Sequence, residues 1–310
     1  MSKILVTGGA GFIGSYVVDL LVADGHTVVV FARSSTHDDP RPQVRTFLGD
    51  IRDQTSVFEA IAHCDAFIHL AGVLGTQETL QNPLPAIDTN IQGGINILEA
   101  AARYDVPGVN IAVGNHWENN PYSITKSTVE RFVRMYNAYR GTHVSIVRAM
   151  NAYGPRQSVA SHNSSKVRKI MPSFIHMALN GDPIEVYGTG AQVMDMVYVT
   201  DVADVLVAAL YQTVAEHARH MKSDEVFSAP MFEVGSGVST SVLDIAKAVR
   251  LSVDSDVRIV NLPMRVGETG GVPAIADRGT LYPLYGEYGK GFVSLKDGVS
   301  KTVEYYRSCL

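Results

Sequence analysis

The sequence has little cysteine, no excess of basic charge and no long hydrophobic run. Only Cys64 and Cys309 occur in 310 residues, which is too few for a framework of disulfides. Lys and Arg total 26 against 31 Asp and Glu, and this balance argues against nucleic acid as the main partner because phosphate binding favours a basic surface. No run approaches the roughly 18 apolar residues that cross a bilayer. We therefore expect a cytoplasmic globular protein with no membrane partner.

The first half of the chain alternates β-branched runs with apolar residues at helical spacing. The strand-like runs are Ile4–Val6, Thr27–Phe31, Ala66–Leu70, Val109–Val113 and His143–Arg148. Strands that alternate with helices indicate a parallel sheet with right-handed crossovers. The sequence therefore predicts an α/β fold built on a Rossmann-type doubly wound parallel sheet.

The alternation loosens after Pro155, where polar loops separate shorter apolar segments. This change of pattern predicts a second, smaller lobe of α+β type that binds substrate. We assign residues 1–155 and about 193–215 to the sheet domain, and about 156–192 and 216–310 to the lobe.

A glycine-rich turn joins the first predicted strand to the first predicted helix. Gly8, Gly11 and Gly14 are spaced three apart, with Phe12 and Ile13 between the last two. Glycine permits a tight turn and lets backbone N–H groups at a helix N-terminus approach a diphosphate. No Lys-Ser/Thr pair follows Gly14, which excludes a P-loop. These five residues are predicted to bind a dinucleotide.

The end of the second strand bears on the choice of cofactor. Dinucleotide folds place a carboxylate about 20 residues after the glycines to hold the adenosine ribose, but Ala32 occupies that register position. Arg33 and Ser34 follow it, and an arginine there can pair with a 2′-phosphate. NADP is therefore favoured over NAD, the alternative being that Arg33 is a solvated loop cation.

Tyr122 and Lys126 lie four residues apart at the start of a predicted helix, and so on one helix face. A nearby ammonium is expected to lower the pKa of the phenol, which would let Tyr122 exchange protons near neutral pH. The pair follows a glycine-rich strand–turn–helix, which makes the pattern specific.

Further motifs extend along the chain at Gly49–Asp53, His69–Gly72, Arg148–Pro155, Val186–Gly190 and Arg265–Glu268. With the glycine turn and the Tyr-Lys pair, they make the sequence similar to the extended short-chain dehydrogenase/reductase family. The similarity is to its NAD(P)-dependent nucleotide-sugar epimerases and dehydratases. It implies that the cofactor also contacts Asp50, Ile51, Leu70, Ala71, Gly72, Asn90, Tyr122 and Lys126. It implies a nucleotide-sugar substrate held by Asn151, Tyr187 and Arg265.

The sequence departs from the family pattern near the Tyr-Lys pair. The family has a Ser or Thr at the end of the fifth strand, whereas Gly114 stands here. Asn115 is the first candidate to donate the missing hydrogen bond and His116 the second, the alternative being a turn that caps the next helix. Only Glu118 provides a carboxylate in this short loop, and Met194 replaces an arginine that binds substrate phosphate in the family.

Three functions remain open from the sequence. The first is a nucleotide-sugar epimerase or dehydratase in which a bound cofactor transiently oxidises a sugar hydroxyl. We favour epimerisation because elimination needs an acid that the short loop barely provides. The second is an NADP(H)-dependent reductase or dehydrogenase of a sugar nucleotide or another carbonyl compound, and the third a non-catalytic NADP-binding sensor. The nucleotide, the sugar and the reacting carbon stay undetermined.

The sequence also allows a prediction about oligomeric assembly. We expect a homodimer through two apolar helix stripes, as the resemblance implies. The stripes are Ile87, Ile91 and Ile95 on one helix and Val129, Phe132 and Val133 on the next.

His217 and His220 are three residues apart, but no third ligand stands near them in sequence. No metal site is therefore predicted, and both histidines are expected to be solvated.

Overall fold

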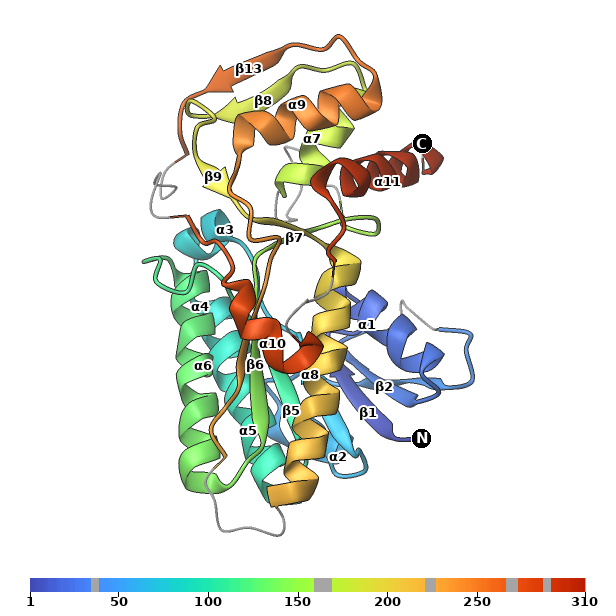
Figure 1. Ribbon diagram of the computed structural model, residues 1–310. Coiled ribbons are helices and arrows are strands. Elements are labelled where there is room, and N and C mark those ends of the chain that lie inside the picture. The colour runs from blue at the N-terminus through green and yellow to red at the C-terminus, as the bar shows by residue number, and fades with distance from the viewer. Residues whose placement is uncertain (35–38, 159–168, 221–226, 266–272, 287–290, 310) are drawn as a thin grey trace.

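The chain forms a large lobe around one sheet and a smaller lobe above it, as the computed structural model shows (Figure 1). The structure describes residues 1–34, 39–158, 169–220, 227–265, 273–286 and 291–309. Among these residues no helix combines the length and the apolarity needed to cross a membrane.

Seven parallel strands form the sheet of the large lobe, in the order β11-β6-β5-β4-β1-β2-β3. The strand order reverses between β1 and β4, which creates the crevice in which doubly wound folds bind ligands. The strands are β1 (Lys3–Thr7), β2 (Thr27–Ala32), β3 (Val44–Leu48), β4 (Ala66–His69), β5 (Gly108–Val113), β6 (Val144–Ala149) and β11 (Met231–Val234). The predicted doubly wound parallel sheet is confirmed.

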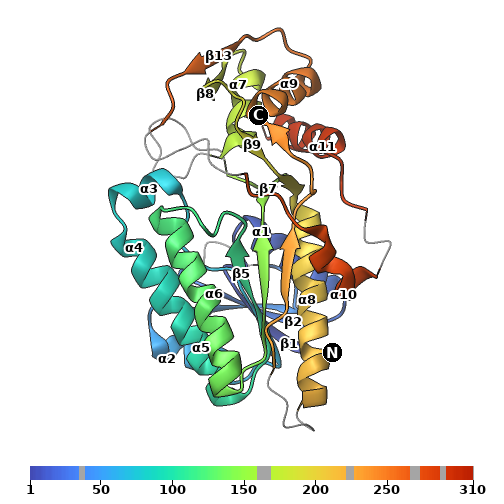
Figure 2. The same cartoon turned by 60° about the vertical axis from the view of Figure 1, so that its left-hand side comes forward.

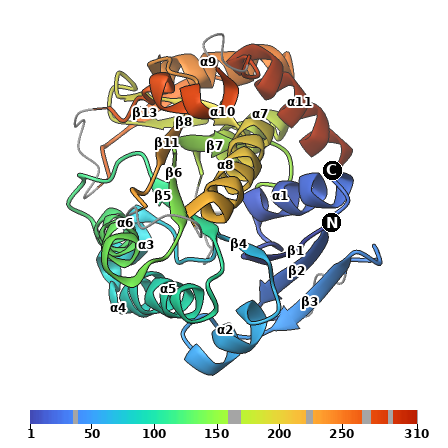
Figure 3. The ribbon, with the colours of Figure 1, turned by 60° about the horizontal axis from the view of Figure 1, so that its bottom comes forward.

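Helices cover both faces of this sheet (Figure 3). One face packs against α1 (Phe12–Ala23) and α8 (Val199–His220) through a core of branched aliphatic side chains. The opposite face packs against α2 (Gln54–Ile61), α5 (Gly93–Tyr104) and α6 (Pro121–Arg140). A chain segment with α3 (Thr76–Gln81), α4 (Leu84–Ala86) and a π-helix, η1 (Ile87–Gln92), leads into α5. Both faces are thus buried, as a parallel sheet requires.

Short strands and three helices build the smaller lobe around a core of its own (Figure 2). Its helices are α7 (Ile170–Leu179), α9 (Val242–Val253) and α11 (Leu295–Ser308). Its strand pairs are β8 (Ile184–Tyr187) with β13 (Ile259–Leu262), β9 (Val193–Met194) with β12 (Thr240–Ser241), and β7 (Asn151–Tyr153) with β10 (Met196–Tyr198).

The structure divides the two lobes differently from the sequence prediction. β11 was assigned to the smaller lobe but is the edge strand of the large sheet, where it pairs with β6. The turn η2 (Arg278–Leu281) and α10 (Tyr282–Tyr285) also pack on the large lobe, against β11 and α8. β9 belongs to the smaller lobe instead. Pairing between segments this far apart in the chain has no local sequence signal, which explains the difference.

Candidate active site

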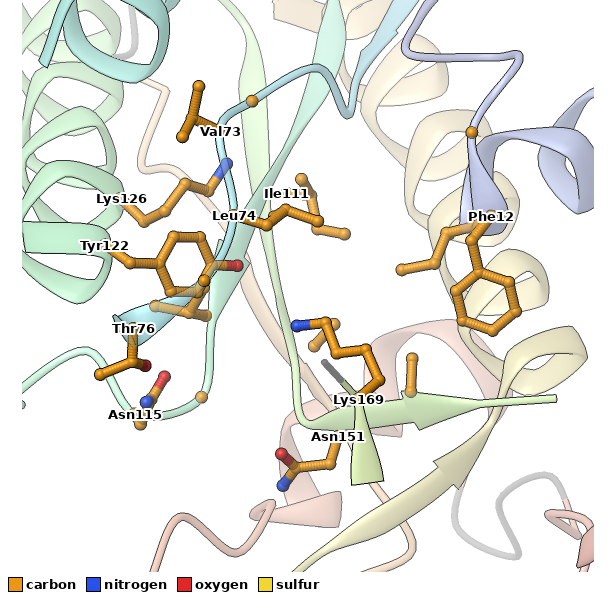
Figure 4. A pocket seen from close by; sticks show the side chains of 18 of the residues that line it. Phe12, Val73, Leu74, Thr76, Ile111, Asn115, Tyr122, Lys126, Asn151 and Lys169 are labelled. Atoms are coloured by element: carbon orange, nitrogen blue, oxygen red, sulfur yellow. The ribbon is translucent and has the colours of Figure 1, made fainter. Parts of the chain in front are cut away.

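A cleft of about 1220 Å³ lies between the two lobes at the carboxyl ends of the sheet strands (Figure 4). Ligand pockets in proteins measure about 300–1,000 Å³, so this cleft has room for two bound molecules. Most of the predicted site residues line it. They are Gly8, Gly11, Phe12, Ile13, Gly14, Arg33, Ser34, Asp50, Ile51, Leu70, Ala71, Gly72, Asn115, Tyr122, Lys126, Asn151, Tyr187 and Arg265.

The glycine turn forms one end of the cleft. Gly8 has a φ of +70°, which disfavours any other residue there. A Cβ on Gly14 would lie 2.1 Å from the carbonyl oxygen of Gly8, so the turn closes directly on the helix. Gly11 donates its N–H to that same oxygen at 2.9 Å, and α1 begins at the next residue. The open N-terminus of α1 therefore faces the cleft, and its geometry fits the diphosphate of a dinucleotide.

The polar groups at the end of β2 lie where an adenosine ribose would be held. Ala32 ends the strand, and Arg33 and Ser34 line the cleft beyond it. Asp50 is held by Arg52, whose Nε and Nη2 donate to its carboxylate at 3.0 and 2.6 Å. The Arg52 guanidinium lowers the pKa of Asp50. This carboxylate is thus already paired with a cation on its own loop.

Tyr122 and Lys126 come from the first turns of α6. Asn120 caps this helix by accepting the Ser123 N–H at 2.9 Å, and Pro121 occupies the first helical position. The Tyr122 ring projects into the cleft, and Lys126 reaches the same cavity from the same helix face (Figure 4).

The ionisation of this pair differs from the sequence prediction. Burial raises the pKa of Tyr122 to about 12, and burial lowers the pKa of Lys126 to about 8. The prediction that the ammonium lowers the phenol pKa is therefore wrong for the protein alone, because desolvation of the hydroxyl dominates. Near pH 8 the phenol is therefore neutral and the amine is about half protonated, so the pair can exchange protons with a third partner.

The two residues that could replace the missing hydroxyl lie in the loop before α6, and only one of them lines the cleft. Asn115 lines the cleft, and its Nδ2 donates to Glu118 Oε2 at 2.7 Å. Asn120 Nδ2 donates to the same oxygen at 2.9 Å. His116 lies outside the cleft lining, with Nδ1 3.1 Å from the Gly114 carbonyl oxygen. An amide has two N–H groups, so Asn115 keeps one that the bond to Glu118 does not use.

Asn90 supports the cleft wall and does not line it. Its side chain is 2% exposed and bonds both to the loop after β4 and to α6. Oδ1 accepts the Val73 N–H at 2.7 Å, while Nδ2 donates to the Val73 carbonyl at 3.1 Å and to Thr125 Oγ1 at 3.0 Å. These bonds hold Asn90 in the cleft wall, and its contact with the cofactor stays a prediction.

Arg265 lies over the ring of Tyr187, with 4.5 Å from its guanidinium carbon to the ring centroid. The pair lines the part of the cleft formed by the smaller lobe. The remainder of the Arg265–Glu268 motif falls outside the described residues. Met194 also lines the cleft, at the position where an arginine was expected from the family pattern.

The structure adds two residues that the sequence analysis did not select. Lys169 precedes α7 and projects into the cavity from the wall opposite Tyr122, beside Asn151 (Figure 4). Burial lowers the pKa of Lys169. Thr76 begins α3 and lies with Asn115 on the Tyr122 side of the cavity. The sequence around Lys169 does not indicate where its side chain points, because the packing of the smaller lobe decides that direction.

Comparison with known proteins agrees with this geometry. The model of the NAD dependent epimerase/dehydratase family matches residues 4–222. The chain belongs to this family. As a family member, it is expected to act as an enzyme with a nicotinamide dinucleotide in the cleft, and the glycine turn described above fits that group.

Relatives of this family member span its whole length. A UDP-N-acetyl-alpha-D-glucosaminuronate decarboxylase from Bacillus cytotoxicus is 27% identical and covers 98% of each chain. The structure of UDP-glucose 4-epimerase from Thermotoga maritima with UDP-glucose is 26% identical, covers 99% of each chain and has a TM-score of 0.85. That of the Thermus thermophilus UDP-glucose 4-epimerase with NAD is 25% identical, covers 99% of this chain and 100% of the other, and has a TM-score of 0.80.

Proposed function

We propose that the protein is a nucleotide-sugar epimerase that oxidises a sugar hydroxyl transiently with a bound nicotinamide cofactor. The observation that carries this proposal is one cleft whose two ends are lined by different binding groups. Gly8 and Gly14 shape a diphosphate cradle at one end, and Lys169 and Arg265 bring positive charge to the other. Tyr122 lines the same cleft, and we propose that a sugar and a cofactor meet beside it.

Tyr122 moves the proton in this reaction. When bound, the nicotinamide supplies the acceptor for the hydride and returns it later. The sugar hydroxyl gives its proton to the Tyr122 oxygen as the carbon is oxidised, and receives it back on reduction. Burial alone opposes the phenolate, with a pKa of about 12. Lys126 is the cation that α6 places on the same face, and its charge offsets that cost.

Two residues compete to replace the hydroxyl that the family pattern places at Gly114. Asn115 offers an amide N–H and Thr76 a hydroxyl, and both lie on the Tyr122 side of the cavity (Figure 4). Either donor would stabilise the sugar oxygen as charge develops on it. Glu118 is engaged by two amides, which leaves it poorly placed as the acid for elimination. This favours epimerisation over dehydration.

The substrate diphosphate is proposed to bind between Arg265 and Lys169. Two phosphates need fixed positive charge, and Met194 stands where the family pattern has an arginine. Lys169 supplies an ammonium on the same side of the cleft, which compensates for that loss. Arg265→Ala and Lys169→Met should each raise the Michaelis constant for a nucleotide sugar about 10- to 150-fold, the value of a charge-assisted hydrogen bond, with cofactor affinity unchanged.

A panel of UDP- and dTDP-sugars tests the proposed function. Each compound is incubated with the protein and cofactor, and the products are followed by proton NMR. Interconversion of two sugars that differ at one carbon supports epimerisation. Loss of water identifies a dehydratase, and a panel that is left wholly unchanged contradicts a nucleotide-sugar enzyme.

We further propose that NADP is bound more tightly than NAD. Ala32 stands where dinucleotide folds have the ribose carboxylate, and Arg33, which lines the cleft beyond it, can pair with a 2′-phosphate. Ala32→Asp should reverse the order of affinities. Titration of both cofactors into the cofactor-free protein measures this, and a parent protein that prefers NAD contradicts it.

A net NADP(H)-dependent reductase is the second candidate. Arg33 at the ribose end and Met194 in place of an arginine are the features that favour it. Consumption of cofactor separates the two functions, because a reductase uses one NADPH for each product whereas an epimerase regenerates its cofactor.

A further inference from the structure

A group of histidines lies at the end of the large lobe remote from the cleft. His143 directly precedes β6, and His217 lies in the last turn of α8. Asp105 ends α5 in a left-handed conformation, with a φ of +52°. These chain positions are at the amino end of the sheet strands, whereas the cleft opens at their carboxyl end. The group is therefore separate from the site proposed above.

Three side chains of this group offer ligand atoms to one point. One nitrogen or oxygen from each of Asp105, His143 and His217 lies within 4.8 Å of the other two. His217 Nε2 is 3.0 Å from Asp105 Oδ1, and the rings of His143 and His217 have centroids 4.7 Å apart. His217 keeps only 12% of its side chain exposed. The expectation that this histidine is solvated is therefore wrong.

Within this group, His143 Nδ1 is a buried polar atom without a hydrogen-bond partner among the described residues of the protein. Buried polar atoms are nearly always paired. The bond between His217 and Asp105 gives each of those side chains a polar partner. It gives none to the His143 ring that packs against His217.

The surroundings of the three residues are those of a ligand site. His220 places its ring 5.5 Å from that of His143, and its Nδ1 lies 3.0 Å from the Glu216 carbonyl. Metal-binding histidines commonly donate their other ring N–H to a carbonyl in this way. Phe227, 5% exposed, packs on both rings at 4.8 and 5.6 Å and gives the group an apolar wall.

We propose that Asp105, His143 and His217 bind a divalent transition-metal ion of the Zn²⁺ type. Two imidazoles and a carboxylate match the ligand preference of zinc. Ligand atoms lie about 2.0–2.2 Å from Zn²⁺, so small side-chain rotations must draw the three groups together. His220 Nε2 or a water molecule completes the tetrahedron. The ion would join three elements that are far apart in the sequence, and its role is to stabilise this end of the lobe.

Zinc titration of the untagged protein tests this site. The protein is treated with chelator, dialysed, and titrated with Zn²⁺ by calorimetry at neutral pH without cofactor or substrate. One ion should bind per chain, and the melting temperature should rise with Zn²⁺. His217→Asn should lower the affinity at least 10-fold, by analogy with the roughly 10- to 100-fold loss on removing outer partners. His176→Asn, which changes an exposed histidine on α7, should bind as the parent does.

Cobalt supplies a second measurement that does not depend on stability. Co²⁺ at this site should give the visible absorption of a tetrahedral nitrogen and oxygen site, lost in His217→Asn and in Asp105→Asn. A parent that binds neither ion, or a His217→Asn protein that binds as tightly as the parent, overturns the proposal. Because no turnover is measured, neither result depends on whether the protein is an epimerase.

Discussion

Lys126 links the chemistry of the site to the stability of the fold at the level of a single residue. It is 5% exposed, and burial lowers its pKa to about 8 from 10.5. The folded state thus disfavours the ammonium, so this residue costs stability in full below about pH 8, and the cost fades as pH rises from about 8 toward 10.5.

Lys126→Met should therefore stabilise the cofactor-free protein at pH 7 while abolishing most activity. The gain should be about 3 kcal/mol, since the pKa is lowered from 10.5 to about 8 and each unit of pKa shift corresponds to about 1.4 kcal/mol. It should shrink toward pH 9, where the parent lysine is mostly neutral. Urea unfolding of both proteins at the two pH values measures the difference. A variant that is less stable than the parent at pH 7 would show that the ammonium is well paired.

Asn115 and Thr76 can be distinguished by paired substitutions. Removing a donor that acts on a developing oxyanion costs about 10²–10³ in kcat. If Asn115 supplies the bond, Asn115→Ala should show this loss and Thr76→Val should stay within a few-fold of the parent. Thr76→Ser is the matched control, since it keeps the hydroxyl. Full activity in Asn115→Ala would assign the role to Thr76 instead, and full activity in both variants would exclude a donor at this position.

The glycine turn sets the cofactor site at the level of an element. A Cβ at Gly14 would meet the Gly8 carbonyl oxygen at 2.1 Å, and backbone cannot move aside as a side chain can. Gly14→Ala should cost about 1–3 kcal/mol of stability through overpacking, and should weaken cofactor binding because α1 is displaced. Gly291→Ala is the control, because a Cβ there meets nothing within 4 Å. Equal cofactor affinity in the Gly14 variant and the parent would contradict the cradle.

The parts of the fold that could be predicted are those that have a signal in the local sequence. Helical spacing and the glycine turn identified α1 and the strand before it, and the Tyr122 spacing placed the pair on α6. By contrast, β3 and β11 join the sheet edges by pairing with distant strands, and nothing within them specifies the partner. Lys169 was missed because the packing of α7 on the smaller lobe directs it. The histidine group was missed because its members are brought together only by the fold.

At the scale of the whole molecule, the homodimer stays a prediction, and burial removes two residues of the expected helix stripes from its surface. Val129 and Val133 are 2% and 0% exposed, and Val129 packs on Gly94, so these residues join α6 to α5 within one chain. Among the apolar side chains that remain exposed on η1 and α6 are Ile87 at 42% and Ile124 at 48%. These two are the better candidates for contact with a second copy.

Light scattering at micromolar concentration measures the assembly. The parent should have the mass of a dimer, and Ile124→Glu should be a folded monomer because a carboxylate cannot be buried unpaired in an apolar interface. Leu251→Glu, on the exposed side of α9 at 80% exposure, is the control and should remain dimeric. A monomeric parent would refute the dimer.

The central claim is that one cleft holds both a cofactor and a nucleotide sugar, and that Tyr122 transfers a proton while the cofactor is regenerated. The most direct measurement counts product against cofactor, with sugar followed by NMR and reduced cofactor by absorbance, at a cofactor concentration far below that of substrate. We predict many turnovers per cofactor with no net change in its reduced form, and a loss of about 10²–10⁴ in kcat for Tyr122→Phe. Product that stops at one equivalent of cofactor, or a Tyr122→Phe protein as active as the parent, would contradict the account.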